Sequence, residues 1–373
     1  MKILLFLHDA YGSNGGIARN NRDLIEAFTA DPRVERVVAL PRILGEQGEP
    51  MPAKLDWRDR AGAGTLAYLR ASFLALLGRR PSVVVAAHLR LLPVAWLASR
   101  LTGSPLWLMI YGIDAWERPQ NPFLGWLTRR ADRVISISDV TTARFQAWAH
   151  VEPERIRLLP CTIDLDRFRP GEKDPTLVAR YGLAGKRVLF TFGRLVSQER
   201  AKGMDEVMQA MPSLLAEFPD LIYLIGGDGP DRPRLAAKAR TLGLADKVIF
   251  AGRIPEEEKL AHYHLADAYA MPSRGEGFGI VLLEAMAAGV PSLASVKDGG
   301  REALLDGRLG LLVDPDDPAS VAAGIRALLA RPKGRPAGLD YYSVASFRRR
   351  VWEFLDELAT PATARSGGAL GRE

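Results

Sequence analysis

Short apolar runs alternate with longer amphipathic segments along the first half of the chain. Runs rich in Val, Ile and Leu between polar residues predict buried strands, and apolar residues three or four positions apart predict helices. The predicted strands are Lys2–Leu7, Val34–Leu40, Ser82–Ala87, Leu106–Ile110 and Arg133–Ile137. The predicted helices are Ala18–Thr29, Leu66–Leu77, Leu92–Leu101 and Val140–Trp148. This alternation is typical of a parallel sheet covered by helices.

The same alternation begins again in the second half. The predicted strands are Arg187–Phe192, Leu221–Ile225, Lys247–Phe250, Ala268–Met271, Pro291–Ala294 and Gly310–Val313. The predicted helices are Met204–Glu217, Pro233–Leu242, Glu256–Leu265, Ile280–Ala288 and a last one at Ser343–Leu358. In this last helix, apolar residues recur at helical spacing and predict an inward face: Val344, Phe347, Val351, Phe354 and Leu355. Two doubly wound α/β domains are therefore predicted.

A turn-rich segment, LPCTIDLDRFRPGEKDP, separates the two series and contains three prolines. It predicts a first domain over residues 1–168 and a second over 173–340. The last helix, 341–359, follows as a separate element. The small and polar tail, 360–373, is predicted to be disordered.

The composition changes this picture little, but it excludes some classes. A hydrophobic content of 47% and a charged content of 25% are those of a folded globular protein. The single cysteine, Cys161, permits no disulfide framework and favours a reducing cytosol. The first apolar run, Ile3–Leu7, is too short for a signal peptide, and no run reaches the roughly 20 residues of a membrane span.

The net charge of +6 admits nucleic acid, an anionic membrane face or phosphorylated substrates as partners. No recognition-helix motif, RNP-like strand or long Lys/Arg tract is present, so nucleic acid is not expected. Basic and apolar residues mix in segments 65–80 and 122–133. Such segments suit an anionic membrane face that presents a polyprenol-linked acceptor, and an amphipathic core helix explains each equally well.

The most specific motif is MPSRGEGFGIVLLEAMAAGVP at residues 271–291. A short strand ends at Met271, and a glycine-rich loop opens a helix. Glu276 falls in this loop and Glu284 about one turn inside the helix, so both can face the carboxyl end of the sheet. The free N–H groups of the helix start suit a phosphate or a sugar hydroxyl. Two carboxylates at that place can accept hydrogen bonds from hydroxyls.

This motif resembles the signature of glycosyltransferase family 4, the retaining enzymes of the GT-B fold. The resemblance implies two Rossmann-like domains that face a cleft, with the C-terminal helix crossing back to the first domain. It implies that Glu276 orients the donor sugar and Glu284 binds the ribose. In GRLVSQERAKG, residues 193–203, it assigns Arg194 and Lys202 to the donor's diphosphate, and Arg194, Lys202 and Glu276 are the predicted catalytic residues. The other predicted donor contacts are Gly16, Gly227, Arg253, Ile254, Gly277, Phe278, Gly279 and Ile280.

One departure from the family pattern occurs in MIYGIDAW, residues 109–116. Many relatives have a histidine that contacts the donor sugar, and this chain has Tyr111. A phenol is a poor base at neutral pH, since its ordinary pKa is about 10. Asp114 and Ser138 are the other predicted contacts to the sugar or the acceptor, and Ser138 is equally explained as a helix cap.

A metal site is not expected. Two Asp-x-Asp strings, at Asp164–Asp166 and Asp314–Asp316, lie in turns where aspartate is common. His262 and His264 are two residues apart on a predicted helix, so they do not share a face and are expected to be structural.

The resemblance implies transfer of a hexose, with retention, from a GDP-mannose or UDP-glucose type of donor to a glycan or lipid-linked acceptor. Cell-surface polysaccharide assembly is the implied process, without cofactor or metal, in the cytoplasm or on the inner face of the membrane. A front-face mechanism and a double displacement both remain open. The alternatives are a GT-B sugar-nucleotide epimerase or disaccharide synthase, and a non-catalytic nucleotide-sugar-binding protein.

Overall fold

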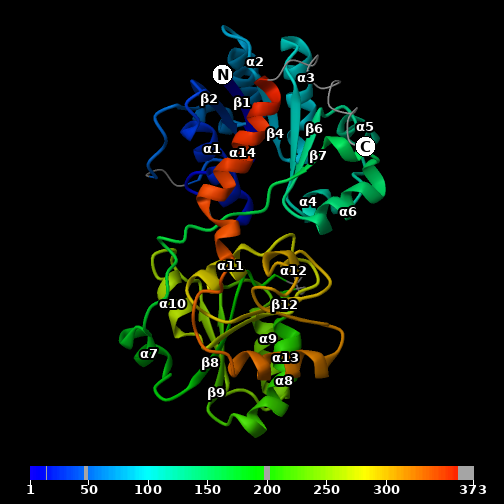
Figure 1. Ribbon diagram of the computed structural model, residues 1–373. Coiled ribbons are helices and arrows are strands. Elements are labelled where there is room, and N and C mark those ends of the chain that lie inside the picture. Colours follow the sequence, from blue (N-terminus) through cyan, green and yellow to red (C-terminus); the bar gives the residue numbers. More distant parts are fainter. Residues whose placement is uncertain (14, 46–48, 197–201, 360–373) are drawn as a thin grey trace, which may run out of the picture. The chain divides into compact units, whose positions relative to one another are not determined.

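The computed structural model describes residues 1–13, 15–45, 49–196 and 202–359 (Figure 1). The chain divides into two compact units. The first unit contains Met1–Cys161 and the chain from Val344 onward, and the second unit is Thr162–Ser343. The expected domain limits at residues 168 and 173 therefore fall within the second unit. The expected tail, 360–373, lies outside the described residues.

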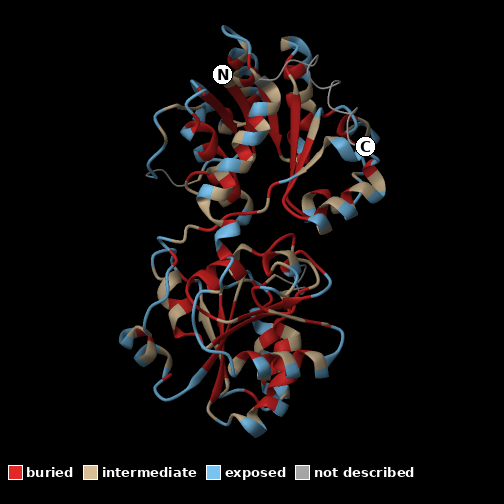
Figure 2. Cartoon of the chain, in the orientation of Figure 1, coloured by how far each residue is buried: buried red, intermediate tan, exposed pale blue. Residues whose placement is uncertain are grey.

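The first unit is built on a seven-stranded parallel sheet. Its strands are β1 (Lys2–Leu7), β2 (Arg36–Pro41), β3 (Leu55–Trp57), β4 (Val83–Ala87), β5 (Leu106–Ile110), β6 (Arg133–Ser136) and β7 (Ile156–Leu158). They lie in the order β3-β2-β1-β4-β5-β6-β7, and the central strands are buried (Figure 2). The winding reverses between β1 and β4, so this pair is the topological switch point of the first unit.

Helices cover both faces of this sheet. They are α1 (Gly16–Ala30), α2 (Thr65–Leu76), α3 (Leu92–Thr102), α4 (Ile113–Trp116), α5 (Pro122–Thr128), α6 (Asp139–Ala149) and α14 (Val344–Ala359), with 3-10 turns η1 (Asp59–Ala63), η2 (Leu89–Leu91) and η3 (Pro153–Arg155). On one face Phe6 and Leu108 share a core with side chains of α2, α3, α5 and α6. On the other face Trp107 meets Phe354 of α14 edge to face, with ring centroids 6.4 Å apart.

The C-terminal helix α14 returns to the first unit, as expected of the GT-B fold. Of the five residues predicted to face inward, Phe347, Val351 and Leu355 are at most 1% exposed, and Val344 and Phe354 are partly buried. The helix is also fastened by polar contacts. Trp352 Nε1 donates to the carbonyl of Ala27 in α1 at 2.9 Å. Such burial is the main source of stability for a helix of this length.

The second unit holds a six-stranded parallel sheet. Its strands are β8 (Arg187–Phe192), β9 (Leu221–Gly226), β10 (Val248–Gly252), β11 (Ala268–Met271), β12 (Ser292–Ser295) and β13 (Leu311–Val313). Its helices are α7 (Pro175–Tyr181), α8 (Met204–Glu217), α9 (Arg232–Thr241), α10 (Lys259–Leu265), α11 (Ile280–Ala287), α12 (Gly300–Ala303) and α13 (Pro318–Leu329), with the 3-10 turn η5 (Leu339–Tyr342). The strand order is β10-β9-β8-β11-β12-β13, so the switch point lies between β8 and β11.

Every strand and helix predicted from the sequence is present, although several begin or end at other residues. The predicted strand at Val34 begins at Arg36, and the helix expected from Glu256 begins at Lys259. The elements that were not predicted are β3, β7, α4, α5, α7, α12 and α13. Most are short, and periodicity carries little signal in three to seven residues. Pro175, expected to mark the linker, instead occupies the first turn of α7, where proline is well tolerated.

Across the described part of the chain, no helix is both long and apolar enough to span a membrane.

Candidate functional site

The candidate site of the second unit lies where β8 and β11 end side by side. Ligands of open α/β sheets bind outside the carboxyl ends of the strands at such a reversal. Two segments leave the sheet there: Gly193–Leu195 follows β8, and Pro272–Gly279 follows β11 and leads into α11. The two motifs that the sequence singled out are thus adjacent in the fold. Residues 197–201 of the first motif, including Arg200, lie outside the described residues.

Glycines allow the loops after β8 and β9 to touch backbone to backbone. A Cβ at Gly227 would lie 1.9 Å from the carbonyl oxygen of Gly193, and a Cβ at Gly229 would lie 2.2 Å from that of Leu195. Both glycines have positive φ, which disfavours any other residue. Gly227 therefore shapes the loop that carries Arg194, and its predicted contact to the donor remains a prediction.

Lys202 and Glu276 meet between the segments that follow β8 and β11. Lys202 Nζ donates to Glu276 Oε2 at 2.6 Å, and the side chains are 22% and 16% exposed. A charge-assisted bond of this length at a half-buried place is strong. Two predicted catalytic residues, 74 positions apart, are thus brought into direct contact.

A buried carboxylate holds the glutamate loop in place. Asp298, which follows β12, is fully buried and accepts the N–H of Glu276 at 2.9 Å and that of Gly300 at 3.0 Å. Burial raises the pKa of Asp298. A Cβ at Gly299 would lie 2.1 Å from the carbonyl oxygen of Gly277, so the two loops also pack closely. The sequence reasoning missed Asp298, although its Asp-Gly-Gly string in the loop after the predicted strand Pro291–Ala294 was a usable signal.

Glu284 lies one turn into α11 with its side chain 4% exposed. Its Oε1 accepts from Lys259 Nζ at 2.8 Å, and its Oε2 accepts from the Tyr263 hydroxyl at 2.8 Å. Burial, with the nearby Glu284 charge, raises the pKa of Tyr263 well above its ordinary value, so the phenol stays a donor. Each carboxylate oxygen keeps a lone pair for a further donor. Neither Lys259 nor Tyr263 was predicted, but their spacing of four on one helix would have placed them on one face.

The remaining predicted donor contacts of this unit lie around the same loops. Arg194 and Arg253 have exposed side chains, at the ends of β8 and β10. Ile254 is 9% exposed, and its Cδ1 would lie 2.6 Å from a Cβ added at Gly226. The start of α11 supplies the others, namely Gly277, the buried Phe278, Gly279 with its positive φ, and Ile280.

The other predicted residues belong to the first unit. Gly16 begins α1, directly after Gly15, whose φ is 142° and whose Cβ position is open space. Ser138 is buried and caps α6, because its hydroxyl oxygen accepts the N–H of Thr141 at 3.0 Å. The structure thus shows the capping role of Ser138, and its predicted contact to the sugar or the acceptor stays a prediction.

Tyr111 does not present a free hydroxyl. The side chain is 7% exposed, and its hydroxyl donates to Asn21 Oδ1 at 2.6 Å. Burial raises the pKa of Tyr111 well above its ordinary value. A buried and engaged phenol of this kind cannot act as a base at neutral pH, which agrees with the sequence argument.

Asp114, three residues after Tyr111, has one carboxylate oxygen that makes no hydrogen bond to a described residue. Its Oδ1 accepts the N–H of Tyr111 at 3.1 Å, and its Oδ2 is buried without a hydrogen-bond partner among the described residues. Burial raises the pKa of Asp114 to about 7, while backbone N–H donors act in the opposite direction. The carboxyl is therefore close to half protonated at neutral pH.

Asp114→Asn is expected to stabilise the protein at alkaline pH. The folded state holds the Asp114 proton up to about pH 7, whereas the unfolded chain releases it near pH 4. Between these values the folded state binds more protons, so stability falls as pH rises through that window. Asparagine carries no charge, and we expect it to add about 2 kcal/mol at pH 8 and little at pH 4, since water screens part of the half-buried charge. Urea unfolding of both proteins across this range measures the difference, and a pH-independent difference would contradict the assignment.

Sequence reasoning did not predict the histidine pair that lies at the switch point of the first unit. Leu7 and Ala87 are paired in β1 and β4, and His8 and His88 follow them, with ring centroids 5.5 Å apart. Burial, then the charge of His8, lowers the pKa of His88 to about 4. Its Nδ1 accepts the N–H of Arg90 at 3.1 Å, so the neutral ring carries its proton on Nε2. A histidine directly after each of two predicted strands was the available signal.

The two Asp-x-Asp strings form turns. Asp164 Oδ1 accepts the N–H of Asp166 at 3.0 Å, and Asp314 Oδ1 accepts that of Asp316 at 2.9 Å. Lys297 Nζ also lies 2.7 Å from Asp314. Among the described residues, no three His, Cys, Asp or Glu side chains form a group that could hold a metal ion.

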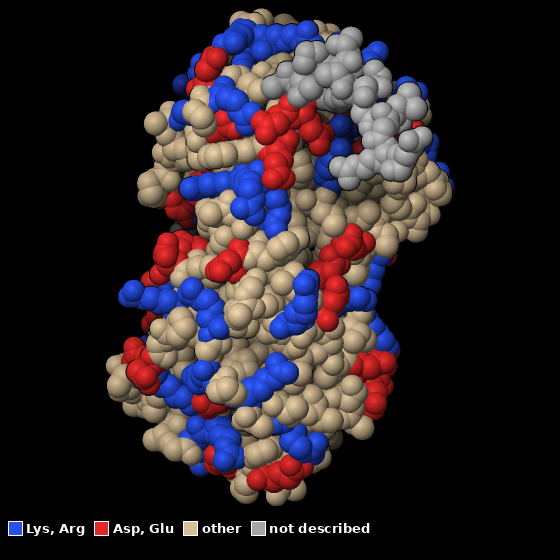
Figure 3. All heavy atoms as spheres, in the orientation of Figure 1, with Lys and Arg blue, Asp and Glu red and all other residues tan. Residues whose placement is uncertain are grey.

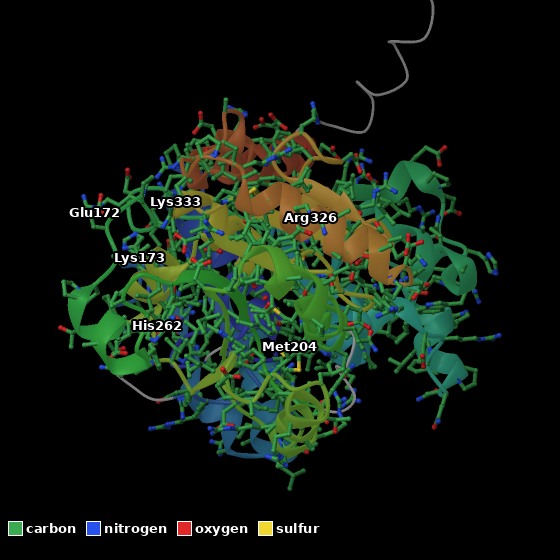
Figure 4. The ribbon with its side chains drawn as sticks, turned by 90° about the horizontal axis from the view of Figure 1, so that it is seen from below. Glu172, Lys173, Met204, His262, Arg326 and Lys333 are labelled. Carbon is green, nitrogen blue, oxygen red and sulfur yellow. The ribbon has the colours of Figure 1, made fainter. Side chains whose placement is uncertain are left out.

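The two histidines of α10 each lie within hydrogen-bond distance of a neighbouring group. His262 is 1% exposed and lies 3.0 Å from the Tyr181 hydroxyl (Figure 4). His264 Nε2 lies 2.8 Å from the carbonyl oxygen of Arg169. Both rings therefore have structural partners, in line with the prediction.

Two Rossmann-like units, each built on a parallel sheet, with the C-terminal helix returning to the first unit, are the architecture of the GT-B fold. The model of "Glycosyltransferase Family 4" matches residues 14–167, and that of "Glycosyl transferases group 1" matches residues 176–341. The chain belongs to family 4 of the GT-B glycosyltransferases.

Relatives with assigned activities match part of their length. A GDP-mannose-dependent alpha-(1-6)-phosphatidylinositol monomannoside mannosyltransferase of Mycolicibacterium smegmatis is 39% identical over 60% of this chain and 62% of the relative. A D-inositol 3-phosphate glycosyltransferase of Geodermatophilus obscurus is 34% identical over 65% of this chain and 55% of the relative. The chain thus matches less than two thirds of the length of either relative.

Solved structures share the fold at low identity. Anabaena Alr3699/HepE in complex with UDP and glucose has a TM-score of 0.71 at 22% identity, covering 95% of this chain and 99% of that one. WaaG, a glycosyltransferase involved in lipopolysaccharide biosynthesis, has a TM-score of 0.60 at 18% identity, covering 98% and 100%. At these identities the likeness shows the fold alone.

Proposed function

We propose that this chain transfers a hexose from a nucleoside diphosphate sugar to a glycan or lipid-linked acceptor, with retention of configuration. The observation that carries the proposal is the Lys202–Glu276 pair, 2.6 Å long, beside the start of α11 at the β8/β11 switch point. The site therefore offers a cation, a carboxylate and free helix N–H groups within one region. One relative named above is GDP-mannose-dependent and one structural neighbour binds UDP and glucose, so both donor types are candidates.

In the proposed reaction Lys202 moves from Glu276 to the donor's diphosphate, joined by Arg194. The bond between the anomeric carbon and the phosphate oxygen breaks, and negative charge develops on the leaving diphosphate. Once Lys202 and Arg194 lie at the diphosphate, they stabilise that charge more than they stabilise the bound donor, which lowers the barrier. Glu276, released from Lys202, accepts hydrogen bonds from the sugar hydroxyls. Glu284 accepts hydrogen bonds from the ribose.

A front-face transfer suits the surroundings of these carboxylates better than a double displacement. Glu284 is 4% exposed, with both oxygens bonded, and Glu276, once Lys202 has left it, is engaged by the sugar hydroxyls. Neither is placed as an open nucleophile. In the front-face route the acceptor oxygen bonds to the anomeric carbon on the face that the diphosphate leaves. The acceptor proton passes to the departing phosphate oxygen. We propose that cations of the chain take the charge and that no metal is needed.

Donor binding tests this site directly. UDP, GDP and ADP and their hexose conjugates are added to the protein, with and without magnesium, and thermal unfolding is followed. A donor at a hundred times its Kd adds about 2.7 kcal/mol of stability. We expect a shift with one base, unchanged by magnesium and lost in Arg194→Ala. No shift with any nucleotide in folded protein would reject the donor site, and a shift without turnover would favour a non-catalytic binding protein.

We also propose that the chain works in the cytoplasm, at the inner face of an anionic membrane that presents the acceptor. The support is the exposed apolar surface of α2, in which Leu66 is 84% and Phe73 63% exposed. Large side chains exposed to this extent favour an apolar partner. Assembly of a cell-surface glycan is consistent with such an acceptor.

A further inference from the structure

One arginine in the loop after β11 is bonded to two other parts of the second unit. Arg274 Nη1 donates to a carboxylate oxygen of Glu206, in the first turn of α8. Its Nε donates to Asp316 Oδ1 at 2.7 Å, and its Nη2 donates to the carbonyl of Pro315 at 2.6 Å. Asp316 and Pro315 lie between β13 and α13. A single side chain thus joins the loop that carries Glu276 to α8 and to the segment after β13.

The bond between Arg274 and Glu206 differs from the ion pairs of the open surface. Figure 3 shows basic and acidic side chains next to one another over much of the second unit. Exposed pairs of that kind contribute little, because water screens them. The Glu206 side chain is only 13% exposed, and its Oε2 is buried without a hydrogen-bond partner among the described residues. Arg274 therefore compensates the charge of a largely buried carboxylate.

The two segments that Arg274 joins carry the two halves of the candidate site. Lys202 lies two residues before the first residue of α8, and Glu276 lies two residues after Arg274. The same segments pack backbone to backbone, because a Cβ at Gly203 would lie 2.6 Å from the carbonyl oxygen of Pro272. The bond made by Arg274 therefore spans the same junction as the Lys202–Glu276 pair.

The start of α8 is also held from its other side. Arg234 of α9 donates to both carboxylate oxygens of Asp205, at 2.8 and 2.7 Å. Lys238 Nζ, on the same helix, donates to Asp205 at 2.7 Å. The first turn of α8 is thus fixed between α9 and the loop after β11 by charge-assisted bonds. Because Lys202 directly adjoins this turn, its backbone is positioned before a donor binds.

We propose that Arg274 is a positioning residue for the transfer reaction. By holding the loop of Glu276 at a fixed separation from α8, it keeps Lys202 and Glu276 where they meet the diphosphate and the sugar of the donor. Its own guanidinium is committed to three acceptors, so it acts through these two residues. A displacement of about 1 Å in a reacting group can cost on the order of 100-fold in rate. The role in transfer rests on the proposed function, whereas the bond itself can be tested without donor.

Steady-state transfer by the full chain tests this role. Glu206→Met removes the bond to α8 and leaves Arg274 paired with Asp316. We expect kcat to fall about 10- to 100-fold and the donor KM to change by less than about threefold, because Lys202 and Glu276 act mainly in the transition state. Asp316→Asn keeps the bond to α8. Since the Asp316 side chain is 57% exposed, this variant should stay within about threefold of the native kcat.

A double variant separates positioning from stability. Arg274→Met leaves the Glu206 carboxylate uncompensated, so it should lose stability in urea as well as activity. Arg274→Met/Glu206→Met removes both charges and should recover that stability, while kcat stays as low as in Glu206→Met. In the Lys202→Ala background, Glu206→Met should lower kcat by less than about threefold further, because the bond acts through Lys202. Recovery of kcat together with stability in the double variant would overturn the inference, as would a native kcat in Glu206→Met.

Arg326→Gln is the matched control, because Arg326 pairs with Glu217 at the other end of α8. If the native protein shows neither a donor shift nor transfer, the proposed function is wrong, and amide hydrogen exchange without donor tests the bond by itself. Exchange at residues 203–206 and 275–277 should be about tenfold or more faster in Glu206→Met, since a bond between charged groups is lost. It should be unchanged in Arg326→Gln. Native exchange in Glu206→Met would show that Arg274 does not hold the two segments together.

Discussion

Replacing Lys202 with alanine is expected to lower kcat/KM for sugar transfer by about 100- to 1000-fold. The Lys202 ammonium lies 2.6 Å from Glu276, between the loops after β8 and β11. In the proposed reaction it stabilises the charge of the leaving diphosphate. Preorganised groups of this kind act mainly in the transition state, so the loss should appear in kcat more than in KM. The measurement is steady-state release of the nucleoside diphosphate with the donor identified by thermal shift.

Lys247→Ala is the matched control for this prediction. Lys247 directly precedes the edge strand β10, at the amino-terminal end of the same sheet, where its Nζ donates to the carbonyl of Pro219 at 3.0 Å. This change removes one positive charge from the second unit without touching the switch point. Turnover should stay within about twofold of the native rate. A Lys202→Ala protein that binds donor and turns over at nearly the native rate would show that Lys202 serves only to hold Glu276.

Replacing Glu284 with leucine is expected to destabilise the second unit by about 3–5 kcal/mol. The substitution leaves the Lys259 ammonium, 14% exposed, with only the exposed Glu256 carboxylate, 3.5 Å away, as a partner, so its charge is poorly compensated. It also leaves the buried Tyr263 hydroxyl without its acceptor. An uncompensated buried charge costs much more than the pair itself contributes. Urea unfolding followed by circular dichroism measures the loss.

A double variant separates the charge effect from simple loss of packing. Lys259→Met/Glu284→Leu removes both charges, and we expect it to recover at least half of the lost stability. The cost that remains is that of the Tyr263 hydroxyl, which is buried without its acceptor. Glu217→Leu is the surface control. Glu217 pairs with Arg326 of α13, which is labelled in Figure 4, and both side chains are more than 40% exposed. That pair is solvent-screened, so its loss should leave stability nearly unchanged. Equal losses in Glu217→Leu and Glu284→Leu would show that burial is not the cause.

Much of the fold was predictable because strands and helices have different apolar periods. The strands Lys2–Leu7, Leu106–Ile110, Arg187–Phe192 and Ala268–Met271 were predicted to the residue. Segments such as β3 and β7 were not, because three residues at the edge of a sheet contain no full period. The strand order could not be predicted from periodicity either, since pairing depends on contacts between distant segments.

The chain by itself determined the elements that local pattern encodes. These are the loop and helix start at Gly275–Glu284, the position of Glu284 one turn inside α11, and the apolar stripe that buries α14. Local spacing specifies them, since neighbours in a helix are three or four residues apart.

Only the tertiary structure decided which charges meet. Lys202 reaches Glu276, Lys259 and Tyr263 occupy both oxygens of Glu284, and Asp298 holds the loop of Glu276. These contacts arise because the reversal between β8 and β11 brings the ends of separate strands together. The tertiary structure of the first unit likewise places the hydroxyl of Tyr111 in a hydrogen bond to Asn21 and leaves leucines of α2 exposed. A sequence pattern shows that a helix has an apolar face, but only packing decides whether the core or a partner covers it.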